Sequence, residues 1–153
     1  MQLRKILVQT VDTVRYTYLL DKAVTAGYPI LLCGPTGTGK SVYILQHLNS
    51  LDSSSFAPPI VLGLSARTTA NTTQYMIDAK LDRRRKGVYG PAAGKRVVVF
   101  VDDLNMPQLE TYGAQPPIEL LRQFMDHGGW YGTSFSFPSR LSPSPCLLCP
   151  PAV

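Results

Sequence analysis

The octapeptide GPTGTGKS, residues 34–41, has the residue types and spacing of a phosphate-binding loop, G-x-x-x-x-G-K-[ST]. Its glycines permit backbone turns that direct successive N–H groups inward, and the positive N-terminal end of a following helix attracts a polyphosphate. Lys40 is placed to span the β- and γ-phosphates, and the Ser41 hydroxyl to ligate Mg²⁺. We therefore predict binding of ATP or ADP by the whole loop: Gly34, Pro35, Thr36, Gly37, Thr38, Gly39, Lys40 and Ser41.

Two acids follow the apolar run VVVFV, which ends at Val101. Asp102 is predicted to hold the metal through water, because a carboxylate at the end of so apolar a strand needs a partner. Asp103 stands where P-loop hydrolases usually have a glutamate that polarises the attacking water. Aspartate reaches roughly 1.5 Å less far, so slow hydrolysis, or binding with little turnover, is expected. The alternative for Asp103 is a solvated loop acid or a helix cap.

The segments around these residues alternate between strand and helix patterns. Apolar periodicity and cap residues predict helices over residues 11–27, 44–51, 68–85 and 116–128. Continuous apolar runs predict buried strands over residues 29–33, 60–66 and 95–101. The repeated strand-loop-helix order indicates an α/β fold, a three-layer P-loop NTPase core with a parallel sheet.

Composition excludes several classes of protein. The chain has 153 residues, enough for one core, and lacks the apolar run of about 20 residues that a membrane span needs. Its beginning lacks a secretory signal, so an intracellular protein is expected. The net charge of +5 is partly concentrated in DRRRKG, residues 82–87, which we interpret as a solvated helix end rather than a phosphate-binding patch. No aromatic residues alternate with these cations, so a nucleic-acid partner is not expected.

The three cysteines do not suggest a metal centre. Cys146 and Cys149 form a lone CLLC pair, and Cys33 precedes the glycine-rich loop. A zinc site needs four ligands, and no second Cys/His pair has suitable spacing. We predict reduced, structural cysteines.

Four blocks of the sequence resemble consecutive parts of the third AAA+ module of an axonemal dynein heavy chain. They are TVDTVRYTYLL, GPTGTGKSVYI, SARTTANTTQYMIDAKLDRRRKGVYGP and VVVFVDDLNMPQLETYGAQPPIELLRQFMDHGGWY, within residues 8–131. By this resemblance, residues 34–41 are the Walker A loop, Asp102 the Walker B metal carboxylate and Asp103 the hydrolytic acid. The segment Val8 to Val11 would line the adenine pocket.

The resemblance also implies a role and partners. The third module of a dynein ring is a regulatory nucleotide site, flanked by neighbouring AAA+ modules, and the microtubule is contacted only by other parts of the parent chain. The expected location is the cytoplasm, in the axoneme of a cilium. A neighbouring module would supply an arginine finger.

The resemblance to dynein ends after GGWYG, residues 128–132, and residues 133–153 contain five serines and five prolines. This composition predicts a disordered tail, so we divide the chain into a partial AAA+ nucleotide-binding domain, 1–132, and a tail, 133–153. The resemblance implies two further strands after Val101, one between the strands ending at Cys33 and Val101. Their absence would leave the fold incomplete at its C-terminal side, with a gap in the sheet and a partly molten or aggregated chain.

Three functions are consistent with these observations. The first is a nucleotide-binding, at best feebly hydrolysing module of a dynein motor. The second is a non-binding remnant of that module. The third is a small P-loop kinase or other phosphotransferase, which would share Lys40, Ser41 and Asp102 but would need a lid with arginines after the third strand.

Overall fold

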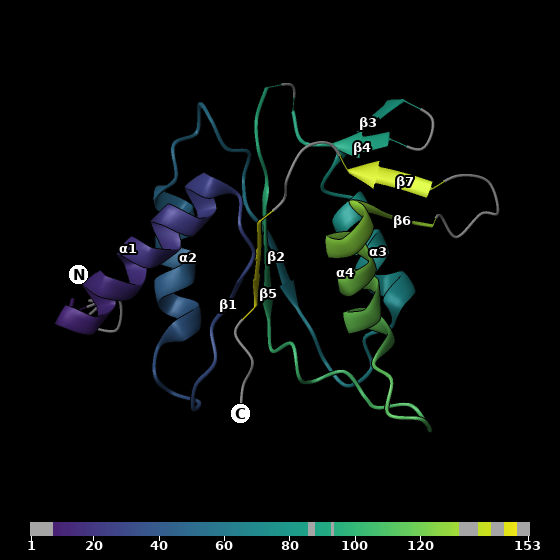
Figure 1. Cartoon of the computed structure of the whole chain (residues 1–153), viewed down its shortest axis with the longest axis horizontal. Coiled ribbons are helices and arrows are strands. Elements are labelled where there is room, and N and C mark those ends of the chain that lie inside the picture. The colour runs from purple at the N-terminus through teal and green to yellow at the C-terminus, as the bar shows by residue number, and fades with distance from the viewer. Residues whose placement is uncertain (1–7, 86–87, 93, 132–137, 142–145, 150–153) are drawn as a thin grey trace, which may run out of the picture.

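The computed structural model describes residues 8–85, 88–92, 94–131, 138–141 and 146–149. The helices are α1 (Val11–Ala26), α2 (Lys40–Ser50), α3 (Ala70–Asp78) and α4 (Pro116–His127). The central sheet consists of β1 (Ile30–Leu31), β8 (Cys146–Cys149), β5 (Val98–Asp102) and β2 (Ile60–Gly63), in that order and all parallel. Helices α1 and α2 cover one face and α3 and α4 the other (Figure 1). The predicted three-layer α/β fold with a parallel sheet is confirmed.

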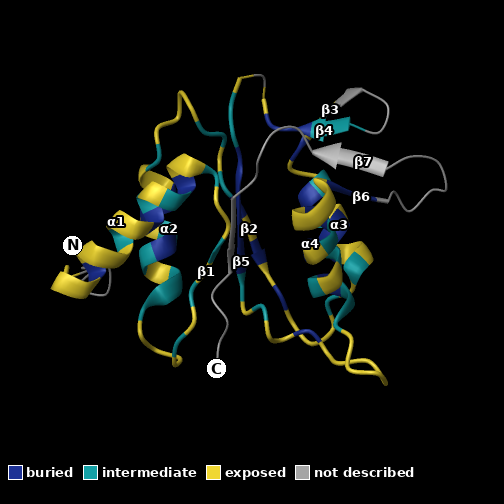
Figure 2. Ribbon diagram, in the orientation of Figure 1, coloured by how far each residue is buried: buried dark blue, intermediate teal, exposed yellow. Residues whose placement is uncertain are grey.

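Strand β5 is buried on both faces, as its unbroken apolar sequence predicts (Figure 2). Side chains of a strand alternate between faces. Accordingly, Val98 and Phe100 pack in one apolar cluster with residues of α1 and α2, and Val99 and Val101 pack in a second with residues of α3 and α4. The strand therefore joins the two halves of the core, and its last residue, Asp102, emerges at the edge where the glycine-rich loop lies.

Local capping signals set the starts of α1 and α3 and the ends of α1 and α4 close to their predicted positions. The side chains of Thr10 and Thr69 cap α1 and α3, and the Thr69 hydroxyl accepts a hydrogen bond from the Thr72 N–H at 3.2 Å. Gly27 and Gly128 end α1 and α4 in the left-handed conformation, with φ of 78° and 67°. These are interactions within a few residues, which is why the sequence reveals them.

The apolar residues that indicated helix α1 do not form its buried face. Val11, Val14 and Tyr18 have the expected spacing, yet they are exposed by 68%, 55% and 60%. The helix instead packs through Leu20 and Val24, which are 5% and 0% exposed. Both sets have helical spacing, so periodicity predicts the helix but not which face contacts the sheet.

Residues 82–85 of the basic segment DRRRKG form a strand, so the prediction of a helix end there is wrong. Helix α3 ends at Asp78, and β3 (Asp82–Arg85) pairs antiparallel with β4 (Val88–Gly90). A second small sheet, in the order β3-β4-β7-β6, adds β7 (Pro138–Leu141) and β6 (Gly129–Tyr131). Asp82 and Arg83 are exposed. The prediction that the segment is solvated is therefore confirmed for these two residues, although they lie in a strand and not at a helix end.

The predicted gap in the central sheet is also wrong, because β8 lies in that position. Leu148 is in register with Ile30 of β1 on one side and with Phe100 of β5 on the other. The expectation of an entirely disordered tail is therefore wrong for the eight residues of β7 and β8. The remaining tail residues lie outside the described part of the chain, and the division at residue 132 stays a prediction.

His47 makes folding stability depend on pH. Its side chain projects from α2 and is 7% exposed, and its Nε2 lies 4.0 Å from Oδ1 of Asp21 on α1. Burial lowers the pKa of His47 below 6.5, and the nearby charge of Asp21 opposes this shift. Below pH 6.5 the unfolded chain therefore binds a proton more readily than the folded chain, so stability falls as the pH drops through this value.

We expect His47→Gln to flatten this dependence. The measurement is the urea midpoint of unfolding at pH 7.5 and at pH 5.5, roughly one unit on either side of an ordinary histidine pKa. Wild-type chain should lose stability at the lower pH and the variant should lose less. His127→Gln, at an exposed histidine, is the matched control. An equal pH response of His47→Gln and wild type would contradict this assignment.

Candidate functional site

The glycine-rich loop joins β1 to α2 and takes backbone conformations that require glycine. Gly37 and Gly39 have φ of 81° and 80°, in the left-handed region that other residues rarely adopt. Gly39 is also the N-cap of α2, and a Cβ there would lie 3.2 Å from the ring of Tyr43. The loop therefore turns directly into the N-terminus of α2, whose first N–H groups have no partner within the helix.

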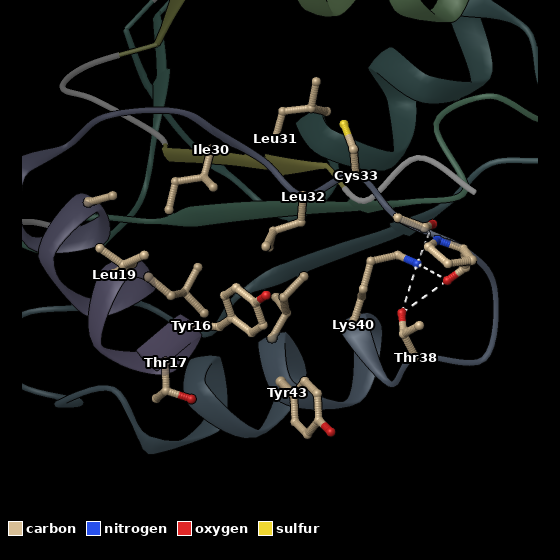
Figure 3. A pocket seen from close by; sticks show the side chains of 15 residues that line it. Tyr16, Thr17, Leu19, Ile30, Leu31, Leu32, Cys33, Thr38, Lys40 and Tyr43 are labelled. Atoms are coloured by element: carbon tan, nitrogen blue, oxygen red, sulfur yellow. Dashed lines mark hydrogen bonds between the residues drawn. The ribbon is translucent and has the colours of Figure 1, made fainter. Parts of the chain in front are cut away.

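Lys40 folds back over this loop from the first position of α2 (Figure 3). Its Nζ donates hydrogen bonds to the carbonyl oxygens of Gly34 and Pro35 at 2.7 and 2.6 Å, and to Oγ1 of Thr38 at 3.3 Å. The Thr38 hydroxyl donates in turn to the Pro35 carbonyl at 3.0 Å. The ammonium group is thus held at the loop by oxygen acceptors, which phosphate oxygens can replace.

Ser41 and Asp102, 61 residues apart in the sequence, are in direct contact. The Ser41 hydroxyl donates to Oδ1 of Asp102 at 2.9 Å, and the backbone N–H of Asp103 donates to the same oxygen at 3.2 Å. One hydroxyl oxygen and one carboxylate oxygen beside a phosphate-binding loop fit the oxygen ligands that Mg²⁺ prefers. The parallel sheet creates this contact, because it places the carboxyl ends of β1 and β5 at the same edge.

Asp103 lies beside the metal-binding pair in an unusual backbone conformation. It is exposed and has φ of 53°, the only positive value among the described residues other than glycine. Aspartate tolerates this region better than most residues. It caps no helix, since α4 begins only at Pro116, so the alternative of a helix cap is excluded. Its carboxylate is free to face a bound ligand or solvent.

Two cavities adjoin the loop, and every residue predicted to bind the phosphates or the metal, or to catalyse hydrolysis, lines one of them. A cavity of about 320 Å³ is lined by Thr36, Gly37, Gly39, Lys40, Ser41, Val42, Asp102 and Asp103. A cavity of about 650 Å³ includes Gly34, Pro35, Thr38 and again Lys40 in its lining. Lys40 is therefore shared by both, and the structure brings all ten predicted residues together.

The larger cavity contains residues that sequence reasoning missed. Tyr16 from α1 and Tyr43 from α2 are part of its wall, together with Cys33, which is exposed and forms no disulfide. Tyr43 follows Lys40 by one helical turn, a signal that was available in the sequence. The segment Val8 to Val11, expected at the adenine, is exposed and lines neither cavity.

The sequence also predicted that the chain has no cysteine-based metal centre and no membrane span. They contain no group of three or more histidine, cysteine, aspartate or glutamate side chains that could hold a metal ion. The side chains of Cys146 and Cys149 lie outside the description, so their predicted role stays a prediction. None of the helices in the described ranges has the length and hydrophobicity to span a bilayer.

Comparison with known proteins agrees with the geometry of this site. Residues 1–141 match the family described as the P-loop containing dynein motor region. The chain is 56% identical over 131 residues to dynein axonemal heavy chain 12 of Mus musculus. This alignment covers 85% of the chain and 4% of that protein. It is 58% identical over 129 residues to dynein axonemal heavy chain 1 of Homo sapiens, covering 82% of the chain and 3% of that protein. The chain thus spans a small fraction of these relatives.

Proposed function

Because the chain belongs to the family of P-loop dynein motor regions, we propose that it is a nucleotide-binding module that takes up Mg·ATP or Mg·ADP. The observation that supports this proposal best is that Lys40, Ser41 and Asp102 lie together at one loop at the edge of the sheet. Helix α2 supplies Lys40 and Ser41 and strand β5 supplies Asp102, so the contact of Asp102 with the loop motif is a property of the fold. Among the described residues that line the two cavities there is no arginine, so these residues give no support to the kinase alternative.

Each of these side chains has a distinct role in the proposed complex. Lys40 exchanges its carbonyl acceptors for phosphate oxygens, and the N-terminus of α2 adds its partial positive charge. Ser41 and Asp102 would hold Mg²⁺, which would neutralise charge on the phosphates. Asp103 is placed to orient a water molecule beside the same cavity. Binding therefore depends on the first three residues, and hydrolysis on the fourth.

In the parent protein we propose a regulatory rather than a motor role. The blocks VDDLNMP and YGAQPPIELLRQ resemble the third AAA+ module of axonemal dyneins, and the relatives named above are axonemal heavy chains. The module would contact neighbouring AAA+ modules of a ring and would reach the microtubule only through the parent chain. Its place would be the axoneme of a cilium. Residues 1–132 would form the nucleotide-binding domain, to which the tail contributes β7 and β8.

The test is binding of Mg·ATP to the full chain by isothermal titration calorimetry. We expect Lys40→Ala to abolish measurable binding, because it removes the cation that contacts the phosphates. Lys80→Ala, at an exposed lysine beyond the end of α3, is the matched control and should bind as wild type does. Superimposable curves for Lys40→Ala and wild type would refute the proposal. Absence of binding to wild type would favour the non-binding remnant.

A further inference from the structure

Two polar atoms are buried close together where α3 meets the small sheet. One is Oδ1 of Asp78, the last residue of α3, and the other is the indole Nε1 of Trp130 on β6. Neither atom has a hydrogen-bond partner in the part of the chain that the structure describes. A buried acceptor without a donor is costly, and so is a buried donor without an acceptor. This pair therefore needs an explanation other than packing.

The surroundings of the pair are apolar. Ile77 and Leu81, on either side of Asp78 in the sequence, pack in one cluster with Trp130, which is 2% exposed. The ring centroid of Phe124 on α4 lies 5.3 Å from that of Trp130. Helices α3 and α4 and strand β6 lie together on one side of the central sheet (Figure 1). An ionised carboxylate at this junction is consequently poorly solvated.

The charge of Asp78 has no described ionic partner. Burial raises the pKa of Asp78 above its ordinary value of 3.8, and the side chains of Gln74 and Trp130 oppose this shift. On β4, the half-buried Tyr89 packs against the same apolar cluster. The charged or titratable side chains described on α4 and on the segment after α3 are all exposed: Glu119, Arg122, Asp126 and His127, and Lys80, Asp82 and Arg83.

We propose that Asp78 and Trp130 form a proton-dependent contact that holds the small sheet against α3. A protonated Asp78 is uncharged, so it remains in the apolar junction at little cost, whereas an ionised Asp78 draws in water and loosens Trp130. Trp130 is in register with Ser139 of β7, so the contact also governs how firmly this strand is held. The junction lies across the central sheet from α2 and is independent of the proposed nucleotide site (Figure 1).

The contact is strongest in acid. Because the folded chain binds the proton of Asp78 more readily than the unfolded chain does, the stability that this proton supplies is fully present below pH 3.8. It is lost as the pH rises through the higher pKa of the folded chain. His47 has the opposite pH dependence, so variants at Asp78 are compared with wild type at each pH.

The first experiment follows the indole N–H of Trp130 by NMR in the full 153-residue chain, where it is the only tryptophan and gives one resonance. The pH is varied between roughly 4 and 7, which covers ordinary and raised aspartate pKa values. We expect the wild-type resonance to titrate with a midpoint above 3.8, and that of Asp78→Asn, which cannot ionise, to stay constant. Asp126→Asn, at an exposed aspartate of α4, is the matched control and should titrate as wild type does. A constant wild-type resonance, or a titration that persists in Asp78→Asn, would overturn the proposal.

Urea unfolding supplies a second measurement. At roughly pH 7.5, Asp78→Asn should have a higher urea midpoint than wild type, and the difference should shrink at roughly pH 5 as wild type takes up its proton. Trp130→Phe removes the indole N–H, so at the higher pH it should lower the midpoint of wild type more than that of Asp78→Asn. Equal midpoints of Asp78→Asn and wild type at both pH values, or additive effects of the two substitutions, would contradict the proposed contact.

Discussion

Replacing Leu148 by proline is expected to abolish the cooperative unfolding transition of this chain. Leu148 lies in the middle of β8, in register with Ile30 on one side and Phe100 on the other. Since β8 is paired along both edges, a proline at this position removes one hydrogen bond of the ladder, whichever neighbour accepts it. Central strands tolerate this change poorly.

The expected loss of stability is a large fraction of the total. A buried carbonyl left without a donor costs about 1–3 kcal/mol, against a net stability of about 5–15 kcal/mol for a domain. Displacement of β8 would further expose the edges of β1 and β5 and the apolar side chains of Val98 and Phe100, which are 1% and 0% exposed. We therefore expect a partly molten or aggregated chain from this single substitution.

Hydrogen exchange combined with urea unfolding measures this effect. Wild-type chain should be monomeric, melt cooperatively and protect the amides of Val98–Asp102. Leu148→Pro should lose the cooperative transition and this protection. Leu148→Val keeps the N–H and an apolar side chain suited to a strand, so it should behave as wild type does. Retained protection in Leu148→Pro would mean that β1 and β5 do not depend on β8.

The isolated chain is expected to hydrolyse Mg·ATP at a rate near the uncatalysed background, even where nucleotide binds. Lys40 is the single cationic side chain among the described residues that line the two cavities at the loop. Loss of an arginine finger alone lowers the rate of phosphoryl transfer by about 10³–10⁵. In the proposed ring this arginine would come from a neighbouring module, which a test on the isolated chain omits.

The strand beside β5 points to the same result. This strand, β8, has the sequence Cys-Leu-Leu-Cys, which contains no amide or charged side chain that could position a water molecule. Asp103 is then left as the one candidate for orienting water, and its side chain is shorter than the usual glutamate. Steady-state phosphate release at saturating Mg·ATP should therefore be equal in wild type and Asp103→Asn. Turnover of roughly 1 s⁻¹ or faster that Asp103→Asn abolishes would contradict this expectation.

The sequence by itself determined the features that depend on neighbouring residues. Residues 34–41 predict a phosphate-binding loop because the glycines, Lys40 and Ser41 act within one turn of chain. The helix ends at Gly27 and Gly128 follow from glycine's access to the left-handed conformation, which a single residue decides. Strand β5 is recognisable because five consecutive apolar residues, Val97 to Val101, suit a strand that is buried on both faces.

Only the tertiary structure decided which segments pair and which faces are covered. Residues 82–85 follow a helical sequence pattern and were predicted to continue that helix, yet they pair with residues 88–90. Helix α1 buries Leu20 and Val24 rather than Val11 and Val14. The short run Cys146–Cys149 carries no local strand signal within its proline-rich surroundings. It becomes a central strand because the facing edges of β1 and β5 need hydrogen-bond partners. Such long-range requirements exist only once the sheet has formed.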